Sequence, residues 1–221
     1  DLLAYKNFMI IVLLTVLTGL FNFPKIANAQ EIANKTITQE HTTKRSSSIS
    51  ASTVGLQGHV LEFDGDEDQV VIGDNENLRP MQITIEAWVR PTGYPDYASV
   101  LTNTSTSSWV DGYGLAHYNN NNDINFFVGN WEQNYVTGKL NGIHKWTHVA
   151  ATYDGSQIIM YIDGQPVDTT SYSGGFNYEN SSLLLGNGTG GYHWMGSLED
   201  VRIWNVARSQ TEIQNSYDQT L

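Results

Sequence analysis

The sequence predicts an all-β fold, an antiparallel two-sheet β-sandwich closed by one short C-terminal helix. Two observations support this prediction. After residue 57, short segments alternate in polarity and are separated by Gly, Asn, Asp and Pro, which is typical of strands joined by turns. No strand–helix–strand repeat is present, so two antiparallel sheets are favoured over a parallel sheet.

The expected strands follow one another along the domain. Residues 83–90 show the clearest pattern, because Ile83, Ile85 and Val89 alternate with polar or aromatic residues and so share one face. Asp154-Gly155 and Asp163-Gly164 are turn sequences that join three consecutive strands into a meander. The strand candidates are residues 58–63, 68–72, 82–90, 97–103, 113–118, 124–129, 133–138, 146–153, 157–163, 166–172, 182–186 and 196–204.

A single helix is expected near the end of the chain. Ser209-Gln210-Thr211-Glu212 has the spacing of a capping box, in which the two side chains bind each other's backbone N–H groups. Ile213 and Tyr217 follow at a spacing of four residues and therefore share one side of a short closing helix.

The first 56 residues differ in composition from the rest. Lys6 precedes an apolar run from Phe8 to Phe23, and Ala27-Asn28-Ala29 offers a cleavage site, so residues 1–29 are expected to be a signal peptide. An uncleaved anchor is the alternative, although the run is short for a bilayer span. Residues 30–56 are polar and rich in Ser and Thr, as in a flexible stalk. The globular domain is then 57–221, secreted or held at a bacterial surface or in a periplasm, with no membrane span after cleavage.

The net charge and the lack of cysteine indicate which partners are unfavourable and from which kind of organism the protein comes. Five of the 11 basic and three of the 23 acidic residues lie in 1–56, which leaves six and twenty, a net charge of about −14, from Gln57 onward. Such a domain repels phosphate backbones, so nucleic acid is an unfavourable partner. The chain has no cysteine, which favours a bacterial exported protein over a disulfide-stabilised animal domain.

Four stretches carry a resemblance to a known family. They are "LEFDGDEDQVVI" (61–72), "ITIEAWVRP" (83–91), "KWTHVAATYDGSQIIMYIDGQPV" (145–167) and "LLLGNGTGGYHWMGSLEDVRIWNVARSQTEI" (183–213). In this order they resemble the laminin G-like jelly rolls of the concanavalin A-like lectin/glucanase superfamily. The resemblance implies a jelly roll whose first and last strands pair, with a concave face that many relatives use for glycans or proteins.

The segment "EFDGDED" (62–68) fits the spacing E-x-D-x-x-E of retaining glucanases. Such enzymes need two carboxyl groups about 5–5.5 Å apart, and Glu62 and Glu67 are the candidates. Gly65 and Asp66 nevertheless indicate a turn on the terminal strand in place of a central catalytic strand. We therefore expect no enzyme activity.

The same acidic turn is a candidate for a structural calcium ion. Asp64, Asp66 and Asp68 place three carboxylates within five residues, and calcium prefers oxygen ligands. The resemblance implies a metal that ties the first strands to the closing strand, with Asp64, Gly65, Asp66 and Asp200 as its ligands and Glu199 as the alternate. A solvated acidic turn without metal is the other interpretation.

Two further motifs are weak. His144 and His148 have a zinc-binding spacing only on a helix, whereas this segment alternates like a strand. The run 186–191 formally matches G-x-G-x-x-G, but dinucleotide binding needs a helix after it and a strand follows here.

Aromatic residues in the loops are the favoured ligand site. Aromatic faces stack on sugar rings, and the neighbouring Asn, Asp and Ser residues can bind hydroxyl groups. The aromatic set is Trp109, Tyr113, His117, Tyr118, Trp131, Tyr135, Tyr192, His193 and Trp194. From it we select Trp109, Tyr113, Tyr118, Trp131 and Trp194 as ligand-binding residues, with packing under loops as the alternative for the tryptophans. Trp88, Trp146 and Trp204 lie in framework strands and are expected in the core.

Together these features predict an exported, non-catalytic recognition module that binds an extracellular carbohydrate. A protein-contact or adhesion domain is the alternative, and a β-glucanase-type glycoside hydrolase is the remote one.

Overall fold

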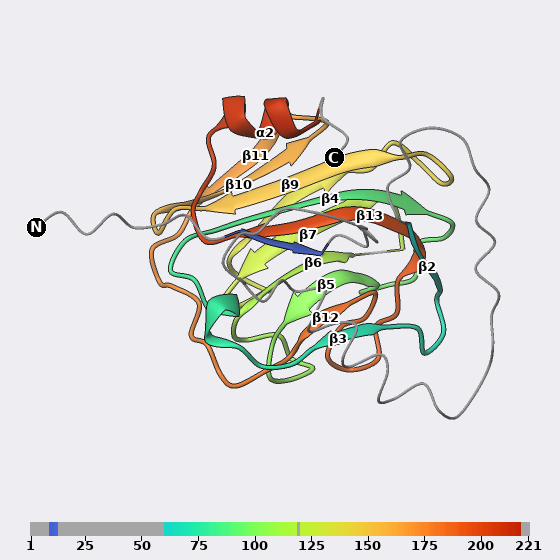
Figure 1. Ribbon diagram of the computed structural model, residues 1–221, viewed down its shortest axis with the longest axis horizontal. Helices are drawn as coiled ribbons and strands as arrows, with labels where there is room; N and C mark the ends of the chain where they lie inside the picture. The colour runs from blue at the N-terminus through green and yellow to red at the C-terminus, as the bar shows by residue number, and fades with distance from the viewer. Residues whose placement is uncertain (1–8, 13–59, 119, 218–221) are drawn as a thin grey trace, which may run out of the picture.

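The computed structural model of the chain describes residues 9–12, 60–118 and 120–217 and forms two antiparallel β-sheets with a short C-terminal helix (Figure 1). The predicted all-β sandwich is therefore confirmed. A large apolar core fills the space between the sheets, with buried side chains contributed by strands of both.

The first sheet has seven strands. Its strands are β1 (Met9–Val12), β2 (Leu61–Asp64), β4 (Ile83–Pro91), β9 (Thr147–Tyr153), β10 (Gln157–Ile162), β11 (Gln165–Ser171) and β13 (Met195–Trp204). They lie in the order β1-β13-β4-β9-β10-β11, and β2 also pairs with β13. The neighbours β9, β10 and β11 are the meander that the two Asp-Gly turns predicted.

The second sheet has six strands in the order β3-β12-β5-β6-β7-β8. They are β3 (Val70–Ile72), β5 (Ser99–Asn103), β6 (Tyr113–His117), β7 (Asp123–Val128), β8 (Tyr135–Lys139) and β12 (Leu183–Leu185). Every strand candidate from the sequence thus has a strand in the structure, with ends that differ by a few residues.

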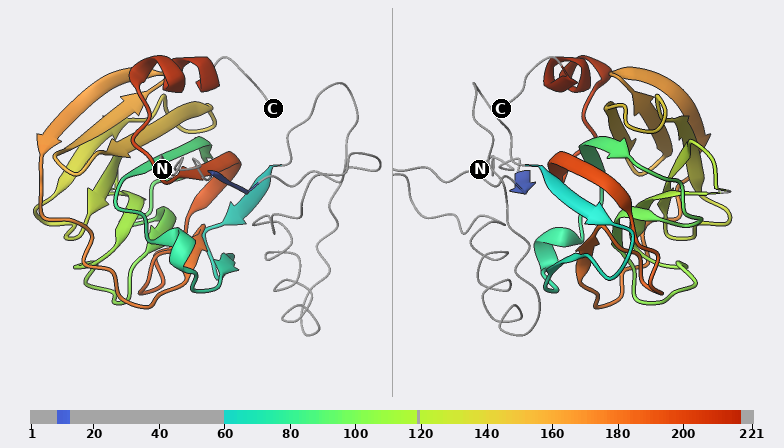
Figure 2. Two further views of the ribbon diagram at one scale, coloured as in Figure 1. Left: turned by 60° about the vertical axis from the view of Figure 1, so that its left-hand side comes forward. Right: turned by 90° about the vertical axis from the view of Figure 1, so that its right-hand side faces the viewer.

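The first and last strands of the domain lie side by side, as the resemblance implied. β2 pairs antiparallel with β13, Leu61 opposite Leu198 and Asp64 opposite Met195, and Figure 2 shows the two strands together. The short strand β1 pairs further along the same edge of β13 and was not expected. It falls within the segment predicted to be a signal peptide. That prediction stays open, and the predicted stalk lies outside the described residues.

The alternation of β4 separates two environments. Ile83, Ile85 and Val89 are fully buried in the core, as predicted. The opposite face also becomes inaccessible, since Glu86 is only 1% exposed. The expectation for the framework tryptophans was wrong: Trp88, Trp146 and Trp204 are half-buried outside the core cluster. Trp88 stacks on Tyr217 and Trp204 lies under the guanidinium of Arg208.

The closing helix α2 (Gln210–Tyr217) begins where the capping box predicted. The Ser209 hydroxyl accepts from the Glu212 N–H, while the Glu212 carboxylate accepts from the Ser209 N–H. Ile213 is buried against Ala150 and Tyr161 of the seven-stranded sheet, so α2 covers the outer face of that sheet (Figure 1). Within the described residues, no helix is long and apolar enough to cross a membrane.

The glycine-rich run 186–191 forms the loop between β12 and β13, so the dinucleotide motif lacks its helix. Gly186 has a φ of +74°, and a Cβ there would lie 2.0 Å from a ring carbon of Phe63. Glycine is therefore required by both the backbone conformation and the close approach of the core.

Candidate functional site

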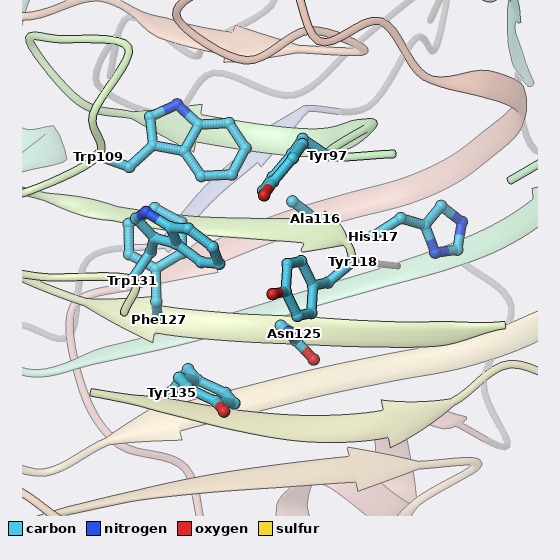
Figure 3. Close-up of a pocket in the computed structure, with 9 residues that line it drawn as sticks. All are labelled: Tyr97, Trp109, Ala116, His117, Tyr118, Asn125, Phe127, Trp131 and Tyr135. Carbon is cyan, nitrogen blue, oxygen red and sulfur yellow. The ribbon is translucent and has the colours of Figure 1, made fainter. Parts of the chain in front are cut away.

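An aromatic groove lies on the outer face of the six-stranded sheet, away from the core (Figure 3). Its residues come from β6, β7 and β8 and from the loops around them. The space above the groove, counted together with open solvent, is about 240 Å³, and the groove is lined by Tyr97, Trp109, Ala116, His117, Tyr118, Asn125, Phe127, Trp131 and Tyr135.

Strand alternation explains which residues reach this face. In β7, Ile124, Phe126 and Val128 enter the core, so Asn125 and Phe127 must point to the opposite side. The antiparallel register then places Asn125 beside Ala116 of β6, and Phe127 beside Tyr135 of β8. The small Ala116 side chain leaves the floor of the groove open between larger rings.

The aromatic side chains hold one another in place. The Trp109 ring stacks on Phe127 with centroids 5.6 Å apart, and its Nε1–H donates to the Thr189 carbonyl at 3.1 Å. Tyr97 meets the edge of Trp131 at 5.5 Å, and Tyr118 meets Trp131 at 5.3 Å. Edge-to-face contacts of this kind are favourable and fix the ring planes. The groove is thus a preformed apolar surface.

One buried polar group faces this surface without a partner. Asn125 is 8% exposed, and its Oδ1 accepts no hydrogen bond within the described residues. An unsatisfied buried acceptor is unfavourable, so a hydroxyl or amide donor from a ligand would stabilise the site. In Figure 3 this side chain lies between Tyr118 and Tyr135. Its Oδ1 is covered by neighbouring side chains, so a ligand donor reaches it only when one of them shifts.

Three of the five predicted ligand-binding residues meet at the groove. Trp109, Tyr118 and Trp131 line it, although Trp109 is mostly covered by its neighbours. Tyr113 and Trp194 do not: both are fully buried in the core, where Tyr113 donates to the Leu78 carbonyl. Their selection is corrected here, because an inaccessible side chain cannot contact a surface ligand.

Three of the residues that line the groove were not predicted from the sequence: Tyr97, Asn125 and Phe127. The signal for Asn125 and Phe127 was present in β7, where they alternate with apolar core residues. Tyr97 had no such pattern, since it precedes β5 in a loop and reaches the groove with a positive φ of 60°. Only the folded loop brings it near Trp131.

His117 lies at the end of β6, and its ring points away from the groove in Figure 3. It stacks on Trp194 with centroids 4.9 Å apart, and Nδ1–H donates to the Asp123 carbonyl at 2.8 Å. Nε2 is buried without a partner. Burial, only partly offset by Asp123, lowers the pKa of His117 to about 4, so the ring is neutral at physiological pH.

Acidification is expected to destabilise the domain through His117. Between pH 6.5 and about 4 the unfolded chain binds a proton here that the folded domain does not, so stability falls as pH falls. The loss is about 1.4 kcal/mol per pH unit, or roughly 3 kcal/mol over that window. His117→Gln should flatten the slope of unfolding free energy against pH in urea titrations. An unchanged slope would contradict the assignment.

The acidic turn binds its own backbone. Asp64 Oδ1 accepts from the Asp66 N–H at 2.8 Å, and Asp68 Oδ2 accepts from the Asp64 N–H at 3.2 Å. Glu62 on β2 accepts from the Ser197 hydroxyl at 2.9 Å, whereas Glu67 lies beyond the strand with a φ of 54°. The two carboxylates of the glucanase spacing thus stand on different local structures, Glu62 on a strand and Glu67 in the turn after it.

Asp200 is not brought to the acidic turn. Asp64 lies opposite Met195, and Asp200 is five residues further along β13, roughly 16 Å at about 3.3 Å per residue. The Asp200 carboxylate binds Arg202 instead, with Nε to Oδ1 at 2.9 Å. Asp64, Gly65 and Asp66 therefore do not fit a joint calcium site with Asp200, and a calcium ion at the turn alone stays a prediction.

The described residues contain no group of three or more His, Cys, Asp or Glu side chains that could hold a metal ion. His148 lies on strand β9 and is buried, while His144 is exposed before the strand begins. The zinc spacing therefore lacks the helix it needs.

A buried charge cluster lies under α2, on the sheet opposite the groove. Glu86 binds the guanidinium of Arg208, and its other oxygen lies 3.7 Å from His148 Nε2 and 3.9 Å from Arg202 Nη1. Burial alone would raise the pKa of Glu86, but the nearby His148 ring and the hydrogen bond and charge of Arg208 outweigh it and hold the pKa below its usual value.

Two antiparallel sheets that carry a preformed aromatic groove on one outer face define a lectin-like sandwich. The chain belongs to the concanavalin A-like lectin/glucanase superfamily, whose laminin G-type model matches residues 64–214. The family that the four sequence stretches resembled is thereby confirmed.

Curated relatives and solved structures show wider likenesses. The chain is 25% identical over 178 residues to pappalysin-1 of Mus musculus and of Homo sapiens; the match covers 69% of this chain and spans 11% of each relative. It is similar in structure to domain 4 of AbnA, an extracellular arabinanase from Geobacillus stearothermophilus, in complex with arabinotriose. That match has 17% identity and a TM-score of 0.59, and covers 75% of this chain and 79% of that one. It is also similar to the binding domain of botulinum neurotoxin DC in complex with SialylT, at 16% identity and a TM-score of 0.54, covering 69% and 39%.

Proposed function

We propose that this domain is an exported, non-catalytic recognition module that binds carbohydrate in the aromatic groove. The observation that carries the proposal is the groove itself: aromatic faces stand beside the buried Asn125 Oδ1, which lacks a donor among the described residues. Sugars present both an apolar C–H face and hydroxyl donors, so one sugar ring satisfies both features.

The half-buried Trp131 is the central contact in this proposal. It touches Tyr97 and Tyr118 edge to face, so its orientation is fixed before a ligand arrives. A preorganised ring loses little conformational freedom on binding, which favours affinity. Tyr135 is 41% exposed on the neighbouring strand and extends the same surface.

The comparisons support carbohydrate binding as a class of function, but they do not identify the ligand. Two solved neighbours of this fold are complexes with carbohydrate, one with arabinotriose and one with SialylT. Their identities to this chain are below 20%, so the likeness is one of fold and the ligand-binding role rests on the groove of this chain. An extracellular location agrees with the extracellular arabinanase among the similar structures.

Trp131→Ala is expected to weaken carbohydrate binding by about ten-fold or more, since central aromatic contacts carry most of the energy of such sites. The measurement is a glycan array of the purified domain followed by calorimetric titration of the strongest binder. Trp146→Ala is the matched control, because Trp146 is also half-buried but is not among the residues that line the groove.

If the Trp131→Ala variant and the wild type are both folded and bind with equal affinity, the groove is not the carbohydrate-binding site. An array without any glycan signal, together with capture of a defined extracellular protein, would favour the protein-contact alternative. Release of reducing sugar from β-glucan that disappears in Glu62→Gln or Glu67→Gln would overturn the non-catalytic assignment.

A further inference from the structure

The polar groups of the aromatic groove are all uncharged. They are the Asn125 amide, the Trp131 indole N–H, the neutral ring of His117, and the hydroxyl groups of Tyr97, Tyr118 and Tyr135. Figure 3 shows Asn125 and the three tyrosines around the space beside Trp131. Among the described residues that line the groove, none is lysine, arginine, aspartate or glutamate. The groove offers hydrogen bonds to a ligand but no counter-charge.

None of the six basic residues from residue 60 to 217 lines the groove, and four of them form ion pairs elsewhere. Arg79 pairs with Asp74, Lys139 with Asp123, and Arg202 and Arg208 with the buried cluster under α2. Lys139 is on β8 like Tyr135, but four residues further along, roughly 13 Å away at about 3.3 Å per residue. A neutral ligand can therefore bind in the groove without breaking any of these ion pairs.

Acidic side chains flank the groove. Asp96 and Glu132 are exposed and adjoin two of its aromatic residues, Tyr97 and Trp131. Burial is the largest cause that raises the pKa of Tyr97, and the charges of Asp96 and, to a smaller extent, Glu132 add to it. The domain around them carries a net charge of about −14.

From these features we propose that the groove selects neutral carbohydrate and rejects sugars that carry a carboxylate. This inference rests on the proposed carbohydrate-binding function. A carboxylate in the groove would lose water without gaining a cationic partner, and would stand beside two like charges. Neutral hydroxyl groups meet neither penalty and supply the donor that Asn125 Oδ1 lacks.

The test compares matched sugars that differ in charge. Neutral oligomers of galactose, glucose and xylose are placed on one array with oligogalacturonate, oligoglucuronate and the methyl ester of oligogalacturonate. The acidic members should bind about ten-fold more weakly or worse at low salt, while the methyl ester should behave as a neutral sugar. The difference should narrow from about 20 mM to about 500 mM NaCl, because salt screens exposed charges.

A gain-of-binding variant makes the inference independent of folding defects. Glu132→Arg should raise the affinity for oligogalacturonate several-fold, because it replaces a flanking negative charge with a cation. The turn around it is held by the Glu132 backbone N–H, which donates to Asn130 Oδ1, so the side chain is free to change. Glu179→Arg, at an exposed acidic residue that is not among those lining the groove, is the matched control and should leave binding unchanged.

Each result separates this inference from the proposed function. Neutral sugars that bind while acidic ones do not would support both. Acidic sugars that bind as tightly as neutral ones, or more tightly, would overturn the charge selection and leave carbohydrate binding intact. A wild-type domain that binds no sugar of either kind would overturn both.

Discussion

Glu86→Ala is expected to destabilise the domain by about 3–5 kcal/mol, because it leaves buried cations without a carboxylate. Glu86 is 1% exposed and binds Arg208, with His148 and Arg202 close to its second oxygen. Arg208 also donates to the Glu212 carbonyl and the Ser216 hydroxyl, so it joins strand β4 to helix α2. Loss of Glu86 would therefore loosen the closing helix as well as the sheet below it.

Urea unfolding of wild type and variant measures this effect. Glu76→Ala is the matched control, since Glu76 is exposed and its removal should change stability by no more than about 0.5 kcal/mol. Amide exchange should show the largest loss of protection in α2. A Glu86→Ala loss as small as that of the control would show that the cluster contributes no net stability.

The same cluster has a defined acid dependence. The pKa of Glu86 lies below its ordinary value of 4.5 in the folded domain, so the unfolded chain takes up a proton first as pH falls. The stabilisation is complete above pH 4.5 and is lost as pH falls through the lower, folded pKa. His117 acts mostly above this window, since its ordinary pKa of 6.5 falls to about 4 in the folded domain.

Trp194→Ala is the second large effect, expected at about 3–5 kcal/mol of lost stability. The side chain is fully buried in the core and stacks on His117, so its removal leaves a cavity that the surrounding sheets cannot fill. Since domains of this size are stable by only about 5–15 kcal/mol, the variant should melt at a much lower temperature. Its folded fraction should still bind the ligand of the groove.

Trp131→Ala is the contrasting substitution. Trp131 is half-buried on the outer face, so its loss should affect stability far less than the loss of Trp194 while it reduces binding. Thermal melts and titrations of both variants test this separation. A Trp194 variant with native stability would contradict its place in the core.

The strand pattern was visible in the sequence because it is local. Alternation, Asp-Gly turns and a capping box act over a few residues, and each of these features has its counterpart in the folded domain. The pairing of β2 with β13 joins distant segments and came instead from the family resemblance.

The site was predictable only in part. Trp109, Tyr118 and Trp131 were selected because aromatic residues in polar loops suggest sugar binding, and they do line the groove. The same rule failed for Tyr113 and Trp194, because composition does not tell which side of a sheet a ring faces. Strand parity gives that answer once the ends of β6 are known, since Tyr113 shares its face with the buried Leu115.

Buried charge was the feature that sequence reasoning missed most clearly. Glu86 alternates with the core-facing aliphatic residues of its strand, and nothing in the local pattern indicates a buried ion pair there. Helix α2 covers the position instead, and Arg208 comes from a segment 122 residues away. Such a pairing depends on tertiary packing and has no local signature.

The two faces of strand β7 have separate roles, one in the apolar core and one in the groove. Ile124, Phe126 and Val128 belong to the core, whereas Asn125 faces the groove. Substitution at Asn125 therefore leaves the apolar interior untouched, and the same holds for Tyr135 at the open edge of the sheet. For protein engineering, the groove-facing positions of this strand can be varied separately from the core positions on which thermostability depends.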